Sequence, residues 1–172
     1  MGRRTISGAV AGLLRSFVSS LARRVDRGTG AERVADRVSP ATRDLSRSEI
    51  RALRPSYEPD PDGSPDPGEI VWAWVPYAEH DGRGKDRPVL IIARIDSSTT
   101  AGCYLSTKQH RGFVSVGSGG WDGQGRESFL ATERVLRLPE RSMRREGHVL
   151  ERGRFLDAVG AVMRAHGIRG RE

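Results

Sequence analysis

The stretch PGEIVWAWVPYAEHDGRGKDRPVLII, residues 67–92, decides how the chain folds. It holds two runs rich in β-branched and aromatic residues, 70–75 and 88–92, and proline or glycine borders them. Such runs predict β-strands. The polar loop between them holds two glycines and a dense set of ionisable side chains: His80, Asp81, Arg83, Lys85, Asp86 and Arg87. Because loops of this kind commonly carry binding and catalytic residues, the hairpin is the first candidate for a site.

The chain after this hairpin continues to favour short strands. Strands are predicted over residues 69–75, 88–94, 102–105, 113–116 and 128–131, with a glycine-rich turn at 117–126 and a short turn over 133–138. Residues 141–147 are predicted to lead into a helix, since Phe155, Leu156, Val159, Val162 and Met163 recur at helical spacing before Gly167. This pattern predicts a mainly β fold with a C-terminal helix, arranged as a small, partly open β-barrel.

The residues before the hairpin divide into two parts. Apolar side chains from Ile6 to Val25 fall at helical spacing, which predicts a basic amphipathic helix over residues 6–27 of an Arg-rich extension, 1–56. The remainder of that extension is predicted to be poorly ordered or marginally helical. Residues 57–67 are rich in proline and acids, which predicts an extended linker before a barrel domain at 68–168.

The amphipathic helix is open to two interpretations. It suits contact with a membrane surface or a partner, and it equally suits docking on its own domain or on a second copy of the chain. No apolar run reaches the roughly 18 residues needed to span a bilayer, and Arg15 interrupts the only signal-like segment. The single cysteine, Cys103, excludes an intrachain disulfide, and no metal-ligand spacing is present. We therefore expect a cytoplasmic protein without metal or cofactor.

The positive charge of the chain is unevenly distributed. The formal net charge is +7, and residues 1–57 hold twelve arginines against five acidic residues. Once the acidic linker is set aside, residues 70–172 hold seventeen basic and twelve acidic residues. The barrel region is therefore mildly basic, and charge alone does not identify its ligand.

Four blocks, in order, resemble the PemK/MazF family of toxin ribonucleases. They are Gly68-Glu69-Ile70-Val71, then Gly84-Lys85-Asp86-Arg87-Pro88-Val89, then Leu105-Ser106-Thr107-Lys108, and last Ser128-Phe129-Leu130-Ala131-Thr132-Glu133-Arg134. The resemblance covers about residues 67–166. It implies an SH3-like barrel of the PemK/MazF/CcdB type and a sequence-selective, metal-independent endoribonuclease of a type II toxin–antitoxin system. It also implies a homodimer whose partners are single-stranded RNA and a cognate antitoxin peptide.

The resemblance assigns a first set of residues to catalysis. Arg87 matches the catalytic arginine of the family, and a guanidinium suits a phosphorane because it stays charged and donates in a fixed fork. Ser106 matches the active-site threonine and Thr107 its serine neighbour, so the two hydroxyls stand in swapped order. Imidazole can act as acid or base, and either His80 or His110 could serve. The alternative for Arg87 is a strand-start residue paired with a surface acid.

A second set is expected to bind substrate. Arg83, Lys85 and Lys108 suit phosphate contacts, with solvated surface as the alternative. Trp121, in the glycine-rich turn, is the preferred base-stacking residue, because at least one of Trp72 and Trp74 is expected in the core. Glu133 and Arg134 are expected near the pocket in structural or substrate-edge roles. The rival to an enzyme is a non-catalytic SH3-like module that binds nucleic acid or protein.

Overall fold

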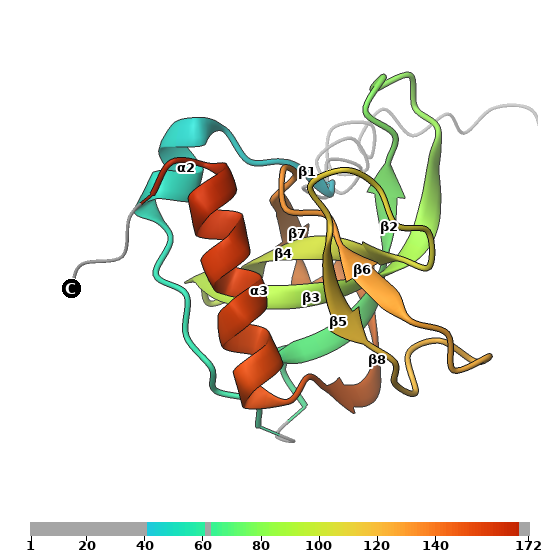
Figure 1. The fold of residues 1–172 in the computed structure, drawn as a ribbon. Coiled ribbons are helices and arrows are strands. Elements are labelled where there is room, and N and C mark those ends of the chain that lie inside the picture. The colour runs from blue at the N-terminus through green and yellow to red at the C-terminus, as the bar shows by residue number, and fades with distance from the viewer. Residues whose placement is uncertain (1–40, 61–62, 169–172) are drawn as a thin grey trace, which may run out of the picture. The chain divides into compact units, whose positions relative to one another are not determined.

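The computed structural model describes residues 41–60 and 63–168 (Figure 1). The predicted helix at 6–27 lies outside the described residues, and so does most of the extension. Contacts divide the chain between Ser39 and Pro40, and residues from Pro40 onward form one compact unit.

Antiparallel strands make up most of this unit. The strands are β1 (Arg43–Asp44), β2 (Glu69–Pro76), β3 (Gly84–Asp96), β4 (Thr99–Ser106), β5 (Val114–Gly117), β6 (Ser128–Leu130), β7 (Leu136–Pro139) and β8 (Met143–Val149). The helices are α2 (Arg47–Ala52), the 3-10 turn η1 (Glu140–Ser142) and α3 (Arg152–Ala165). The main strand order is β1-β7-β4-β3-β2-β8, and β6 pairs with both β4 and β5. These antiparallel strands and the helix that follows them confirm the predicted mainly β fold with a C-terminal helix. The sheet is open.

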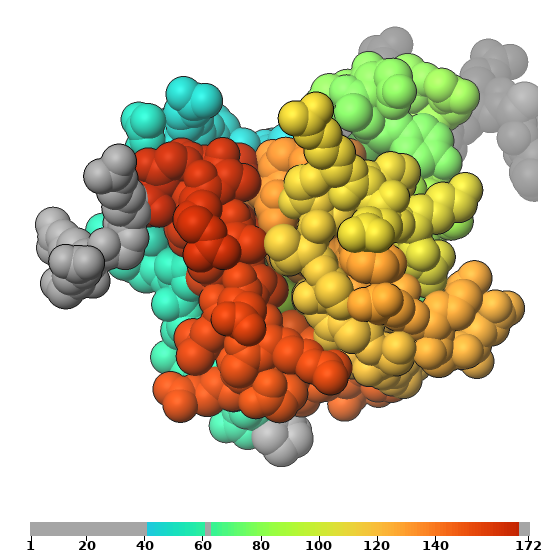
Figure 2. Space-filling view, viewed as in Figure 1, coloured from blue at the N-terminus to red at the C-terminus, as the bar shows by residue number. Residues whose placement is uncertain are grey.

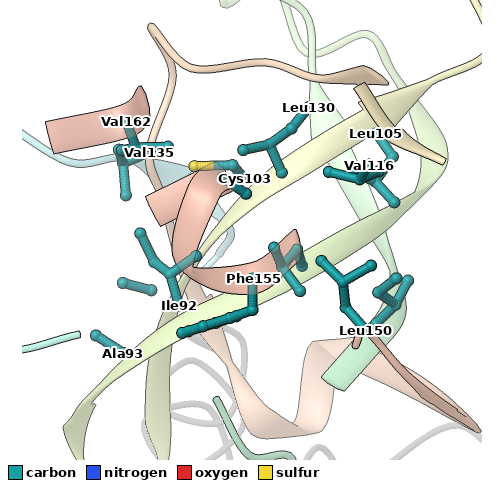
Figure 3. Packing of buried hydrophobic residues seen from close by; sticks show 14 of the residues in the cluster. Ile92, Ala93, Cys103, Leu105, Val116, Leu130, Val135, Leu150, Phe155 and Val162 are labelled. Atoms are coloured by element: carbon teal, nitrogen blue, oxygen red, sulfur yellow. The ribbon is translucent and has the colours of Figure 1, made fainter. Parts of the chain in front are cut away.

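Two hydrophobic clusters hold the sheet together. The larger one lies under α3 and includes Phe155 and Val162 of this helix together with sheet residues such as Leu105 and Leu130 (Figure 3). The smaller cluster is built from Val71, Ala73, Val75, Val89, Ile91, Leu136 and Leu138, with Tyr104 and Met143 packed against it. Neighbouring apolar residues along β2 and β3 therefore belong to different clusters, because successive side chains of a strand point to opposite faces of the sheet.

Helix α3 begins and ends where its sequence allows. The Glu151 side chain accepts the backbone N–H groups of Gly153 and Arg154, which would otherwise lack partners at the helix start. At the other end Gly167 adopts a φ of 68°, a left-handed conformation that favours glycine. In the space-filling view α3 lies beside the segment that includes β5 (Figure 2). Within the described residues, no helix is long and apolar enough to cross a membrane.

The segment before β2 is part of the packed structure. Leu45 and Ile50 lie in the larger cluster, and the Tyr57 hydroxyl donates to the Leu150 carbonyl at 2.9 Å. Asp66 pairs with Arg94 at 2.5 Å. Residues 57–67 were predicted to form an extended linker before the barrel domain. In the described part of this segment, Tyr57 and Asp66 contact the packed unit.

The strand before α3 was not predicted. Residues 141–147 were predicted to lead into a helix; residues 143–147 belong to β8, an edge strand that pairs with β2, and α3 follows it. The charged side chains of β8 conceal the alternation of a strand, and charge is typical of edge strands because it discourages pairing with other chains. Residues 136–139, predicted as part of a turn, form β7 between β1 and β4.

Candidate functional site

A pocket of about 290 Å³ opens where β3 and β4 diverge. It includes six of the predicted site residues: Lys85, Arg87, Ser106, Thr107, Lys108 and Trp121. We call it the Arg87 pocket. Trp72, Tyr104, His110 and the loop residues Asp122 and Arg126 complete much of its wall.

The β3–β4 ladder explains why Arg87 and Ser106 share this pocket. Val89 pairs with Tyr104 in the antiparallel register, and continuing that register places Arg87 opposite Ser106. Pro88 has no N–H to donate, and the β3–β4 pairs end at Val89. Arg87 and Ser106 therefore lie just beyond the point where the β3–β4 ladder stops, and both line the pocket.

The pocket keeps unbalanced positive charge. Its two carboxylates are already engaged, Asp86 with Arg144 at 2.8 Å and Asp122 with Arg126 at 2.8 Å. The hydrogen bonds from Arg126 lower the pKa of Asp122 to about 2, so this group stays ionised at neutral pH. Among the residues that the structure describes, no carboxylate forms an ion pair with Lys85, Arg87 or Lys108.

The two adjacent hydroxyls differ in their surroundings. The Ser106 oxygen accepts the Lys108 backbone N–H at 3.0 Å, which fixes its orientation and leaves its proton free to donate. Thr107 is exposed in the turn that follows β4. Both residues line the pocket together with Arg87, so the swapped order leaves a hydroxyl-bearing residue in the pocket in either assignment.

Tyr104 is a site residue that the sequence analysis did not select. The Arg87 guanidinium carbon lies 5.0 Å from the centre of its ring, and that of Arg134 lies at 5.8 Å. Burial raises the pKa of the phenol, and the two guanidiniums act against that rise. The alternation of β4 was the available signal, because Tyr104 lies two positions before Ser106 and so shares its face.

The tryptophans differ from expectation. Trp121 lines the pocket but is only 5% exposed, and its indole N–H donates to the Ser128 hydroxyl at 3.0 Å. Neither Trp72 nor Trp74 belongs to a core cluster, and Trp74 is 54% exposed. The Trp72 indole N–H is buried at the pocket with no hydrogen-bond partner among the described residues.

Four predicted site residues lie outside the Arg87 pocket. Arg83, Glu133 and Arg134 line an adjoining hollow of about 500 Å³, which shares Arg87 and Tyr104 with the pocket. His80 lines a third hollow, where its Nε2 lies 3.3 Å from the Asp44 carboxylate. The structure thus brings His110, rather than His80, into the pocket with Arg87.

Arg134 is held firmly in this adjoining hollow. Its Nε and one terminal nitrogen donate to the two Asp44 carboxylate oxygens at 2.9 and 3.0 Å, and the terminal nitrogen also donates to the Pro76 carbonyl at 3.0 Å. Burial acts to lower the pKa of Arg134, but the bonds and charge of Asp44 outweigh it and the pKa is raised.

Two other features of the described residues bear on function. No group of three or more His, Cys, Asp or Glu side chains in the described ranges is arranged to hold a metal ion. A larger hollow, about 1030 Å³, lies between α2 and the end of α3 and contains none of the predicted site residues.

The fold and the pocket together define the class of protein. The fold is a small open sheet closed by one helix, and the pocket beside β3 and β4 is lined by cationic and hydroxyl-bearing residues. Residues 66–164 match the sequence profile of the PemK-like, MazF-like toxins of type II toxin–antitoxin systems. The chain belongs to this family. Comparison with curated protein sequences gave no significant match.

Several solved structures are similar in fold. One is the MazE–MazF complex (Form-II) from Deinococcus radiodurans, at 16% identity and a TM-score of 0.47, covering 63% of this chain and all of that chain. An endoribonuclease in complex with its cognate antitoxin from Mycobacterial species has 14% identity and a TM-score of 0.46, covering 63% of this chain and 99% of that one. MazF (Form-I) from Deinococcus radiodurans has 16% identity and a TM-score of 0.48, covering 62% of this chain and all of that chain.

Proposed function

We propose that this protein is a metal-independent endoribonuclease toxin that cleaves single-stranded RNA. The observation that carries the proposal is the juxtaposition of Arg87, Ser106, Lys85 and Lys108 in one pocket. Arg87 has no ion-pair partner among the described residues, so its charge is available to a substrate phosphate. Membership of the PemK-like, MazF-like toxin family supports the same class of activity.

The proposed reaction is an internal transfer at phosphorus. The ribose 2′-oxygen loses its proton to a base and attacks the adjacent phosphorus, which forms a P–O2′ bond. The P–O5′ bond then breaks and the 5′-oxygen takes up a proton. The products are a 2′,3′-cyclic phosphate and a free 5′-hydroxyl. The step needs stabilisation of a dianionic phosphorane, and preorganised charge is usually the largest contribution of this kind.

The pocket residues divide into roles under this proposal. Arg87 stabilises the phosphorane, and the Ser106 or Thr107 hydroxyl donates to a phosphate oxygen. His110 is the preferred acid or base because it lines the pocket with Arg87, whereas His80 pairs with Asp44 in a separate hollow. A side chain that transfers a proton must reach the reacting atom.

The neighbouring residues are proposed to hold the RNA chain. Lys85 and Lys108 contact flanking phosphates, which positions the strand without reading its sequence. Arg83, Glu133 and Arg134 contact the strand where it leaves the pocket through the adjoining hollow. Buried Trp121 supports the pocket wall and offers little open ring for stacking.

We also propose two protein partners. A cognate antitoxin segment would cover the Arg87 pocket, since the solved relatives include toxins in complex with their antitoxins. A second copy of the chain would complete a homodimer. Co-expression with the neighbouring reading frame, followed by copurification, tests the first partner, and light scattering of the purified chain tests the second.

Cleavage in the presence of EDTA tests the proposed activity. The full chain is incubated with a labelled single-stranded RNA, and fragment ends are analysed for 2′,3′-cyclic phosphate. Fragments from the native chain that disappear in Arg87→Ala support the enzyme. Arg141→Ala is the matched control, because this exposed arginine follows β7 near the Thr99 end of β4, away from Ser106.

The same experiment distinguishes the rival function. Intact RNA that nevertheless shifts on a native gel with the wild-type chain would establish a binding module and overturn the enzyme. Equal cleavage by the wild-type and Arg87→Ala chains would remove Arg87 from its proposed role.

A further inference from the structure

A residue outside the family's matched range contacts the candidate site. Asp44 belongs to β1, more than twenty positions before the match begins at residue 66. It pairs with Leu136 in β7, and the next residue, Leu45, donates its N–H to the Val135 carbonyl at 2.8 Å. Leu45 and Ile50 fix this segment in the larger core cluster. Asp44 therefore has a defined position beside the site.

The Asp44 carboxylate forms a two-point contact with Arg134. The two distances are 2.9 and 3.0 Å, and only 17% of the Arg134 side chain is exposed. Charge-assisted contacts of this forked geometry restrict both the position and the plane of a guanidinium. The third contact, to the Pro76 carbonyl, restrains the same group from another strand.

Arg134 in turn contacts the residue that supports Arg87. Tyr104 has the Arg134 guanidinium carbon 5.8 Å from its ring centre and that of Arg87 at 5.0 Å. Two cations share one ring, and like charges repel unless one is neutralised. Asp44 neutralises Arg134, so of the two guanidiniums at the Tyr104 ring only Arg87 has no ion-pair partner among the described residues.

We propose that Asp44 is a positioning residue that, through Arg134 and Tyr104, sets the orientation of Arg87 in the candidate active site. The proposal rests on the proposed function for its effect on cleavage. Under this proposal the β1–α2 segment, which precedes the family's matched range, contributes a positioning residue to the site. The positioning itself is independent of RNA cleavage and can be measured without substrate.

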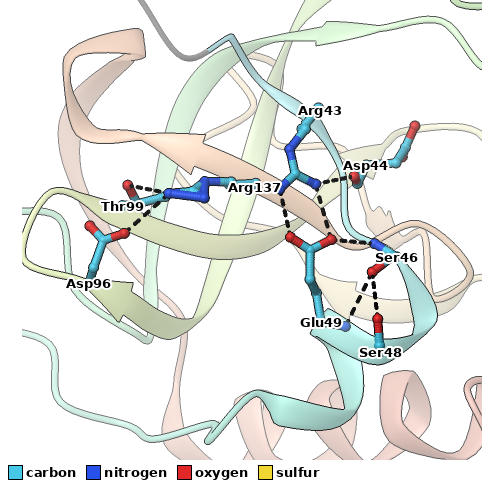
Figure 4. A network of polar contacts seen from close by, with 8 residues as sticks. All are labelled: Arg43, Asp44, Ser46, Ser48, Glu49, Asp96, Thr99 and Arg137. Carbon is cyan, nitrogen blue, oxygen red and sulfur yellow. Dashed lines mark hydrogen bonds and ion pairs between the residues drawn. The ribbon is translucent and has the colours of Figure 1, made fainter.

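A neighbouring ion pair supplies the control. Glu49 accepts two hydrogen bonds from Arg43, at 2.6 and 3.1 Å, in the same β1–α2 segment. Figure 4 shows the Asp44 side chain extending away from this pair. Asp44→Asn and Glu49→Gln each replace one carboxylate of the segment by an amide of similar shape. Only Asp44→Asn should alter the orientation of Arg87 in the candidate active site.

The first measurement uses NMR of the arginine side chains in the full chain. In Asp44→Asn the Nε–H resonances of both Arg134 and Arg87 should shift, the second because its position relative to the Tyr104 ring changes. In Glu49→Gln both should stay unchanged. An unchanged Arg87 resonance in Asp44→Asn would overturn the proposal, and so would an equal shift in Glu49→Gln.

The second measurement is kcat/KM for RNA cleavage. Asp44→Asn should lower it by about tenfold to a hundredfold, as expected for a misplaced catalytic group, and Glu49→Gln should leave it within about twofold. In an Arg134→Gln background, Asp44→Asn should add less than about twofold, because both changes remove the same contact. Additive losses would contradict action through Arg134.

Arg134→Lys gives a second route should Asp44→Asn fold poorly. Lysine keeps the charge but lacks the two-point contact, so the Arg87 resonance should shift as in Asp44→Asn. An unchanged Arg87 resonance would count against the proposal. If the wild-type chain does not cleave RNA, the proposed function fails, while the NMR result still decides whether Asp44 positions Arg87.

Discussion

The Arg87 guanidinium carbon lies 5.0 Å from the centre of the Tyr104 ring, in the range of a cation–π contact. This contact supports the guanidinium without using its hydrogen-bond donors. An arginine held by a carboxylate would have those donors occupied. Arg87 is thus both positioned and available, which is the condition for binding a phosphate.

Removal of the Tyr104 ring should weaken the proposed cleavage. Tyr104→Leu is expected to lower kcat/KM by about tenfold, because a cation–π contact contributes about 0.5–2 kcal/mol. Tyr104→Phe keeps the ring and should retain activity within about threefold of wild type. Steady-state cleavage of a labelled RNA provides the comparison. Equal losses in both variants would instead indicate a role for the phenol hydroxyl.

The two hydroxyls beside Arg87 should contribute unequally. Ser106→Ala is expected to reduce cleavage by about tenfold to a hundredfold, because Ser106 is already oriented by the Lys108 N–H. Thr107→Val removes an exposed hydroxyl and should cost less than about threefold. Single-turnover rates at saturating enzyme separate this effect from binding. A larger loss in Thr107→Val would reverse the assignment.

His110 and His80 should differ in the pH dependence of cleavage. His110→Ala is expected to remove one limb of the pH–rate profile and to lower the maximum by about a hundredfold, as for a general acid or base. His80→Ala should keep the shape of the profile, because His80 faces Asp44 in a separate hollow. Rates measured over a range of pH with both variants decide between the two histidines.

Gly119 should be intolerant of a side chain. A Cβ atom there would lie 2.0 Å from the buried Trp121 ring, so Gly119→Ala must displace that ring. We expect a loss of about 1–3 kcal/mol in the free energy of unfolding, the usual cost of overpacking. Gly123→Ala is the control, since a Cβ there meets nothing within 4 Å. Urea unfolding of both variants measures the difference, and equal stabilities would refute this packing argument.

The central strands and the closing helix could be predicted from the sequence because most of their apolar residues pack in the hydrophobic clusters. Residues of β2, β3 and β4 are dominated by β-branched and apolar side chains that fill the two clusters, and the predicted ends lie within four residues of the observed ends. The short helix α2 was harder to predict, because it has six residues and buries only Ile50. A capping box of Ser46 and Glu49 was its available signal.

The residues of the site could be predicted from sequence motifs, but the contacts between residues far apart in the sequence could not. Arg87 and Ser106 were assigned from the resemblance to the family's blocks, and the β3–β4 register then brings them into one pocket. Tyr104 becomes a site residue through the positions of two guanidiniums, and the hydrogen bond that Arg134 donates to Asp44 joins residues 90 positions apart. Such pairings depend on how β1 meets β7, which no local pattern in the sequence specifies.

The pairing of β1 with β7 also determines how far the chain can be shortened. A fragment limited to residues 66–164 would lose Leu45 and Ile50 from the interior and leave backbone donors and acceptors of β7 open to solvent. Bare strand edges next to uncovered apolar surface recruit other molecules into intermolecular sheets. The family's matched range is therefore a poor choice for preparing this protein in soluble form, and the first residues to keep are those just after Ser39.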